Sequence, residues 1–189
     1  MKRNNIIIFF ATLLLIGCGT TYTPHPYGYV RIEIPEPVYE TFDSAGFPYS
    51  FNINRISTIE NKNGQNEKYW LDIHYNNYNA RIHCSYKPVE NNLGLLSEEA
   101  EKFVYKHANM ASSIPCRSYE NQEKKVYAVV YDIEGNTASP CQFVITDSTN
   151  HFFRGALYFN CTPNQDSLSP IIDYIKEDIV ELMESFSWK

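Results

Sequence analysis

A continuous apolar stripe close to the C-terminus constrains the fold of this chain more than any other feature of its sequence. Apolar side chains recur there every three or four positions, at Ile171, Ile172, Ile175, Ile179, Leu182, Met183 and Phe186. This period predicts an amphipathic helix with one buried face. The outer face is acidic, whereas helices that lie on membranes favour lysine and arginine there, so we expect this helix to dock on a sheet.

The start of this helix is marked by capping residues. Asp166, Ser167 and Ser169 each offer a side-chain oxygen to the free N–H groups of a first turn. Pro170 is then expected within that turn, where its missing N–H is not needed. A second helix is predicted over residues 93–112, where apolar side chains again follow helical spacing and acids cluster near the N-terminal end.

Most other segments alternate as β-strands do. The predicted strands cover residues 29–34, 49–53, 69–75, 80–87, 114–120, 124–133, 140–147 and 151–161. The order of strands, a helix, antiparallel strands and a closing helix predicts an α+β domain in which both helices cover an antiparallel sheet. This order resembles the Mog1/PsbP-like α-β-α sandwich.

The N-terminus has the pattern of a bacterial lipoprotein leader. A basic head precedes the apolar run 6–16, which is too short to cross a membrane. The run ends in Leu-Ile-Gly-Cys at 15–18, which resembles a lipobox, and the alternative is an ordinary secretory signal with a chance cysteine. We predict a signal peptide over 1–17, acylation of Cys18 with palmitate-like chains, a tether over 18–28 and a single domain over 29–189.

Charge and cysteine content limit the partners of the mature chain. Its formal charge changes from −6 to −8 when Lys2 and Arg3 leave with the leader, since 14 basic and 22 acidic residues remain. We therefore expect no nucleic acid partner, and membrane contact only through the lipid anchor. An exported compartment permits disulfides, but three pairings are open and buried free thiols fit equally well. The cysteines concerned are Cys84, Cys116, Cys141 and Cys161.

One predicted hairpin has a polar face that contains possible metal ligands. Strands 69–75 and 80–87 place Asp72, His74, Arg81 and His83 on one side. Charged and aromatic cross-strand pairs on a solvated face explain this pattern better than a metal site does. The cysteines and histidines also lack zinc-site spacing, so we expect neither a metal nor another cofactor.

Several stretches, in order along the chain, resemble one known family. They are residues 28–32 (GYVRI), 35–37 (PEP), 105–107 (YKH), 133–139 (IEGNTAS), 142–148 (QFVITDS), 151–159 (HFFRGALYF), 173–179 (DYIKEDI) and 182–185 (LMES). Together with the lipobox they look like GldD, the gliding-motility lipoproteins of the Bacteroidetes. The likeness covers essentially the whole mature chain.

This resemblance implies a function in the cell envelope. It implies a lipoprotein that is needed for gliding and for the type IX secretion machinery, acts beside other lipoproteins of that set, and has no catalytic activity. Surface-exported lipoproteins of this phylum tend to have an acidic run after the acylated cysteine. No acid lies between Cys18 and Glu33 here, which favours an anchor in the outer membrane with the domain facing the periplasm.

The stretch 151–159 suggests an interaction surface. Phe152, Arg154 and Tyr158 share one face of the predicted strand, and an arginine beside exposed aromatic rings is typical of an interaction hot spot. A solvated arginine packed along a tyrosine ring is an equally good interpretation. Gly155 marks a place where a strand bends or another backbone approaches.

Two other classes of function compete with an accessory role in the cell envelope. Ser139, Asp147 and His151 resemble the members of a hydrolytic triad, and Cys141 resembles a thiol nucleophile, but neither lies in a nucleophile-elbow sequence. We therefore predict no catalytic residues. A periplasmic lipid- or glycan-binding module is the alternative, because aromatic residues make up 15% of the chain and suit a groove between helix and sheet.

Three Asp-Ser pairs resemble a Bacteroidetes O-glycosylation sequon. They place candidate glycans on Ser44, Ser148 and Ser167. Asp-Ser pairs are also common in turns and N-caps, so a structural role is the alternative to glycosylation at each position.

Overall fold

The computed structural model describes residues 33–62, 64, 67–106, 109–162 and 164–189. The predicted signal peptide, the acylated Cys18 and the tether over 18–28 lie outside these residues, as do residues 29–32 of the first predicted strand. Residues Ile32–Lys189 make up a single compact unit.

Two antiparallel sheets form the β-structure of this unit. The larger sheet has the order β3-β4-β5-β9-β8-β7-β6 and the smaller one the order β1-β2-β10. Strands of the larger sheet are β3 (Thr58–Asn61), β4 (Leu71–Tyr75), β5 (Ala80–Pro88), β6 (Cys116–Asn121), β7 (Val126–Asp132), β8 (Cys141–Thr146) and β9 (His151–Phe159). The smaller sheet consists of β1 (Tyr39–Phe42), β2 (Tyr49–Asn54) and β10 (Ser187–Trp188).

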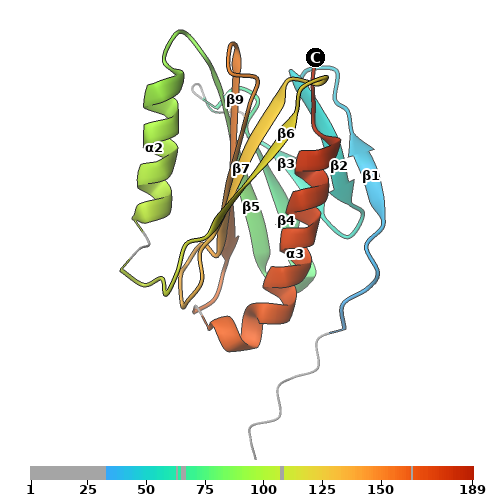
Figure 1. Cartoon of the computed structure of the whole chain (residues 1–189). Coiled ribbons are helices and arrows are strands. Elements are labelled where there is room, and N and C mark those ends of the chain that lie inside the picture. The colour runs from blue at the N-terminus through green and yellow to red at the C-terminus, as the bar shows by residue number, and fades with distance from the viewer. Residues whose placement is uncertain (1–32, 63, 65–66, 107–108, 163) are drawn as a thin grey trace, which may run out of the picture. The chain divides into compact units, whose positions relative to one another are not determined.

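Two α-helices lie on opposite faces of the larger sheet (Figure 1). Helix α3 (Gln165–Ser185) covers the main core, in which Phe153 and Leu157 of β9 are fully buried. Helix α2 (Leu93–Tyr105) covers a smaller cluster that includes Phe152 of the same strand. Successive side chains of a strand point to opposite faces, so the two helices meet alternate residues of β9.

The predicted fold class is confirmed, because the chain is an α+β domain with helices on an antiparallel sheet. Several boundaries differ from the prediction. Residues 33–38 are not a strand, and the short strands β1, β3 and β10 were not expected. Helix α2 ends at Tyr105 rather than at residue 112.

The start of α3 also differs from the prediction. Its N-cap is Asn164, whose side chain accepts a hydrogen bond from the Ser167 backbone N–H. Pro170 therefore lies inside the helix rather than in its first turn. Proline removes one helical hydrogen bond and crowds the preceding turn, and the ribbon changes direction near the start of α3 (Figure 1).

A buried polar network joins α3 to the strands. Asp178 is 4% exposed and accepts hydrogen bonds from the hydroxyls of Tyr39 (2.8 Å) and Tyr75 (2.9 Å). The side-chain amide of Asn54 donates to both carboxylate oxygens at 3.1 Å and to the Tyr174 hydroxyl at 2.8 Å. This network fixes one turn of α3 against β1, β2 and β4.

The four cysteines at 84, 116, 141 and 161 are all free thiols. Cys84 and Cys141 are buried in the core, as the alternation of their strands predicts. The alternation predicted over 151–161 places Cys161 on the apolar side with Leu157 and Phe159, but Cys161 is exposed because β9 ends at Phe159. Among the described helices, none is long and apolar enough to cross a membrane.

Candidate functional site

A cleft of about 490 Å³ lies between α2 and the face of the sheet that α2 covers. Its floor is built from β4, β5 and β9, and its outer wall is α2. Clefts of roughly 300–1,000 Å³ are the usual size of small-molecule sites in proteins. The cleft is therefore large enough for a ligand of moderate size.

Strand pairing places the floor residues next to one another. In the antiparallel register Asp72 of β4 lies opposite His83 of β5, and Ser85 of β5 lies opposite Arg154 of β9. All four line the cleft. Since residues two apart on a strand share a face, β5 contributes Arg81, His83, Ser85 and Lys87 to the same floor.

The wall of the cleft is mostly apolar. Leu96 and Ala100 of α2 pack on Phe152, and all three are buried. Phe103, one turn further along α2, is 42% exposed and closes the outer side. Lys87 and Glu99 form an ion pair at 2.7 Å that joins β5 to α2.

Arg154 extends from β9 into this cleft without a carboxylate partner among the described residues. Its Nη2 donates to Gln142 Oε1 at 2.7 Å, and its guanidinium carbon lies 4.5 Å from the centre of the Phe103 ring. Its Nε and the Nε2 atom of Gln142 are both buried and have no acceptor in the described part of the chain. Burial lowers the pKa of the Arg154 guanidinium, although an arginine stays charged in proteins.

The acids around Arg154 are engaged elsewhere. Asp72 is 3% exposed and lies 2.9 Å from Lys62 Nζ and 2.8 Å from His83 Nδ1. Burial alone would raise the pKa of Asp72, but the hydrogen bonds from Lys62 and His83 outweigh it and lower the pKa. Glu99 is held by Lys87, as described above.

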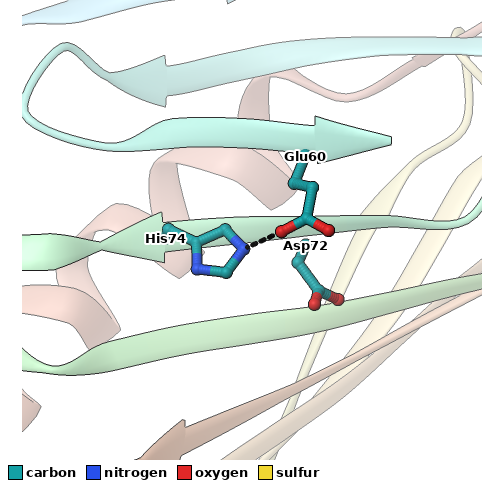
Figure 2. A group of neighbouring side chains, drawn as sticks. All are labelled: Glu60, Asp72 and His74. Carbon is teal, nitrogen blue, oxygen red and sulfur yellow. Dashed lines mark hydrogen bonds and ion pairs between the residues drawn. The ribbon is translucent and has the colours of Figure 1, made fainter. Parts of the chain in front are cut away.

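A second cluster at the edge of the sheet has the composition of a metal site. Ligand atoms of Glu60, Asp72 and His74 lie within 4.8 Å of one another (Figure 2). Within this part of the described chain the side chains already pair with one another, because His74 Nε2 lies 2.9 Å from Glu60 Oε2 and Lys62 Nζ lies 2.9 Å from Glu60 Oε1. The Glu60–His74 pair joins β3 to β4, whereas Lys62 directly follows the strand that contains Glu60. The absence of a metal from this cluster stays a prediction.

The predicted interaction surface requires one correction. Phe152 is 4% exposed and packs under α2, so the expectation that its ring is exposed is wrong. Alternation correctly places Phe152, Arg154 and Tyr158 on one face, but it does not reveal that a helix covers that face. Tyr158 is half-buried and packs edge-on against His83, with ring centres 5.4 Å apart.

The structure separates the residues that resemble a hydrolytic triad. Ser139 lies two residues before Cys141 of β8, and Cys141 pairs with Leu157 of β9. His151 is the first residue of β9, six residues before Leu157. At about 3.3 Å per residue this distance along the strand is roughly 20 Å. His151 Nδ1 lies 2.8 Å from the Tyr86 hydroxyl, and its ring stacks on Trp188 with centres 4.8 Å apart.

Asp147 stabilises the turn between β8 and β9. Its carboxylate accepts backbone N–H groups of Thr149 (3.0 Å), Asn150 (2.8 Å) and His151 (2.8 Å). Burial alone would raise the pKa of Asp147, but these hydrogen bonds outweigh it and lower the pKa to about 2. The folded state therefore favours the ionised carboxylate.

This arrangement predicts a pH-dependent loss of stability. The pKa of Asp147 falls from 3.8 to about 2 on folding. The ionised carboxylate therefore stabilises the folded state fully above about pH 4, and this stabilisation is lost between about pH 4 and pH 2. We expect the free energy of unfolding of the wild-type protein to exceed that of Asp147→Asn by about 1 kcal/mol at pH 7, after allowance for solvent screening. Urea unfolding of both proteins at pH 7 and pH 2.5 tests this. A difference that stays constant with pH would contradict it.

The candidate glycosylation sites have ordinary structural roles. Ser148 is exposed in the β8–β9 turn and has a φ of 69°. Ser167 is exposed and donates its backbone N–H to the N-cap Asn164. Ser44 is half-buried, and its carbonyl accepts from Phe47 N and Lys189 Nζ. Glycosylation of these serines stays a prediction.

The fold and the cleft together define a small α+β domain with a ligand-sized space between one helix and an antiparallel sheet. The chain belongs to the family of the gliding motility lipoprotein GldD, whose family model matches residues 19–188. The predicted family is thereby confirmed. Membership makes the chain a lipoprotein associated with gliding motility and anchored in the cell envelope.

The comparison with solved structures finds a similarity to a cyanobacterial protein. The solution structure of cyanobacterial PsbP (CyanoP) from Synechocystis sp. PCC 6803 matches with a TM-score of 0.48 and 9% sequence identity. The match covers 85% of this chain and 98% of that chain. The comparison with curated proteins finds no match.

Sequence reasoning identified only part of the cleft. The hairpin pattern predicts the polar face with Asp72, Arg81 and His83, but the sequence analysis missed Phe103, which lines the cleft, and Gln142, which contacts Arg154 without lining the cleft. A glutamine on a strand of apolar residues is the signal that would identify Gln142, because a buried amide needs a partner. Phe103 fits the apolar spacing predicted over 93–112, and its place over Arg154 depends on how the helix docks.

Proposed function

We propose that this lipoprotein is a non-catalytic accessory component of the gliding motility and type IX secretion machinery of a Bacteroidetes cell envelope. It acts by binding other lipoproteins of that machinery. The observation that carries this proposal is the family match over residues 19–188. The separation of Ser139 from His151 supports a role in binding rather than in hydrolysis.

The proposed location follows from the N-terminal sequence. Acyl chains on Cys18 would hold the protein in the outer membrane, since two or three chains give stable anchoring where one does not. The segment between Cys18 and Glu33 contains no acid, which supports a domain that faces the periplasm.

Site-specific photocrosslinking in native envelopes tests the proposal. A photoreactive residue is placed at Leu95 on α2, Glu184 on α3 or Ser118 on β6, all of which are exposed. A specific partner covers one side of the domain, so we expect adducts with identified gliding or secretion lipoproteins from one or two of the three positions. Equal labelling of unrelated envelope proteins from all three positions would contradict the proposal.

A second candidate function is the binding of a small ligand in the cleft under α2. The observation that favours it is that a cleft of about 490 Å³ is lined by Arg154, whose Nε–H has no acceptor among the described residues. A protein of this kind can combine both roles, because the cleft occupies only the α2 side of the sheet.

A further inference from the structure

The guanidinium of Arg154 is the feature of the cleft that the accessory role does not explain. A cation that is removed from water costs free energy unless a charge or a set of acceptors compensates it. Arg154 receives one acceptor, Gln142 Oε1, and the face of one ring, Phe103. In the described part of the chain no carboxylate lies within ion-pair distance of it, although ten other ion pairs occur there.

The missing partners near Arg154 are acceptors rather than donors. Arg154 Nε and Gln142 Nε2 are both buried N–H groups without an acceptor among the described residues. The orientation of the Gln142 amide is set by the arginine, which can only donate and therefore faces the amide oxygen. Gln142 does not line the cleft, so Arg154 is the one of these two residues that a ligand in the cleft can contact. A guanidinium that lacks acceptors is suited to an oxyanion.

The charged residues that line the cleft also favour an anionic ligand. Four cationic side chains line it, Lys62, Arg81, Lys87 and Arg154, against three acidic ones, Glu67, Asp72 and Glu99. Lys62 pairs with Asp72 and Lys87 pairs with Glu99, which leaves the cations Arg81 and Arg154 against the single acid Glu67. This cationic balance stands out in a chain whose formal net charge is −6.

Apolar side chains adjoin the charged floor. Leu96, Ala100 and Phe152 form a buried cluster, and the Phe103 ring lies over Arg154. The Trp70 ring also lines the cleft and is held by its Nε1–H, which donates to the Tyr86 carbonyl at 2.9 Å. A ligand that fills this space therefore meets an anion site and an apolar wall together.

We propose that the cleft binds a small amphipathic anion, a phosphate or carboxylate carried on an apolar body, and that Arg154 receives its oxyanion. The inference rests on the second candidate function and names its ligand class. Arg154 donates to the oxyanion from its free N–H groups, as arginine commonly does to phosphate and carboxylate. The wall of Leu96, Phe103 and Phe152 holds the apolar body.

Binding measurements on the mature lipoprotein in detergent test this inference. The probes are phenyl phosphate and phenylacetate, with benzyl alcohol as the neutral aromatic control. Loss of a charge-assisted hydrogen-bond pair weakens binding on the order of tenfold or more. We therefore expect Arg154→Gln to bind at least one anionic probe about tenfold more weakly than wild type. Arg55→Gln removes an exposed cation from the Arg55–Glu40 pair and is expected to bind as wild type does.

A measurement on the wild-type protein keeps the inference testable if Arg154→Gln does not fold. The NMR signal of the Arg154 Nε–H group is expected to shift on addition of phenyl phosphate or phenylacetate and to stay in place with benzyl alcohol. Dihexanoyl phosphatidate, used below its critical micelle concentration, is the lipid probe. Tighter binding of it than of phenyl phosphate indicates a lipid headgroup, and the reverse indicates a soluble ligand.

Two outcomes would overturn the inference in different ways. If benzyl alcohol binds as well as the anionic probes, or Arg154→Gln binds them unchanged, the cleft is a binding site but Arg154 is not its oxyanion receptor. If no probe binds and the Nε–H signal does not move, the cleft itself is not a site for this ligand class, and the second candidate function fails with it. Neither outcome affects the proposed accessory role.

Discussion

Replacement of Asp178 by alanine is expected to destabilise the folded domain by about 3 kcal/mol. The carboxylate accepts from Tyr39, Asn54 and Tyr75 in the interior, and removal of the acceptor leaves these donors without a partner. Each orphaned buried donor costs roughly 1–3 kcal/mol, and loss of one member of a buried charged network costs roughly 3–5 kcal/mol. We take the lower end because Tyr39 is only half-buried.

Urea unfolding at neutral pH measures this effect. Asp178→Asn keeps one carbonyl acceptor and is expected to lose less stability than Asp178→Ala. Glu184→Ala, an exposed acid on the same helix, is the matched control and is expected to change stability by less than about 0.5 kcal/mol. Burial raises the pKa of Asp178 in spite of its hydrogen bonds. An Asp178→Ala protein as stable as wild type would show that the network contributes nothing to the docking of α3.

Gly155→Ala is expected to be the most damaging single-methyl change in the sheet, with a loss of about 3 kcal/mol. Gly155 lies directly opposite Phe143 in the β8–β9 pair. A Cβ atom at position 155 would overlap the Cζ and Cε1 atoms of the Phe143 ring. That ring is fully buried, so it has no space into which to move. Overpacking of a close-packed core costs typically 1–3 kcal/mol.

A second substitution distinguishes this clash from a general loss of chain flexibility. Phe143→Leu removes the ring, so the double variant Gly155→Ala with Phe143→Leu is expected to be less destabilised than the sum of the two single variants. Gly94→Ala is the control, because an added Cβ there meets nothing within 4 Å and alanine favours the helix. If the stability losses of the two single variants add up in the double variant, the clash between residue 155 and the Phe143 ring is contradicted.

The fold was predictable where periodicity is long and strong. The apolar stripe from Ile171 to Phe186 identified the core face of α3, and the alternation of 80–87 and 151–161 identified the central strands β5 and β9. The short strands escaped prediction for a physical reason. Thr58–Asn61 has only one partly buried side chain and Ser187–Trp188 has two residues, so neither offers a period to detect.

The candidate site was predictable only in fragments, because its parts come from distant segments. Asp72 and His83 belong to one hairpin and were recognised as a polar face. Arg154 joins them through the pairing of β5 with β9, which brings Ser85 and Arg154 opposite each other across about seventy residues of chain. Local pattern carries no information on such a pairing.

The error at Phe152 has the same origin. Phe152 and Arg154 share one face of β9, and a strand pattern shows which residues share a face but not what covers it. Here α2 covers that face, so Phe152 is buried with Leu96 and Ala100 while Arg154 reaches the cleft. A scan of interaction residues should therefore use exposed positions such as Leu95, which is 70% exposed, instead of Phe152.

The most direct test of the proposed function is the photocrosslinking experiment extended to the lipid anchor. The photoreactive residue at the position that labels best is combined with an intact Cys18 or with Cys18→Ser, which cannot be acylated. The account predicts an adduct with a gliding or type IX secretion lipoprotein from the acylated protein and its loss, or a large decrease, with Cys18→Ser. Absence of such an adduct from the acylated protein at Leu95, Glu184 and Ser118 alike would contradict it.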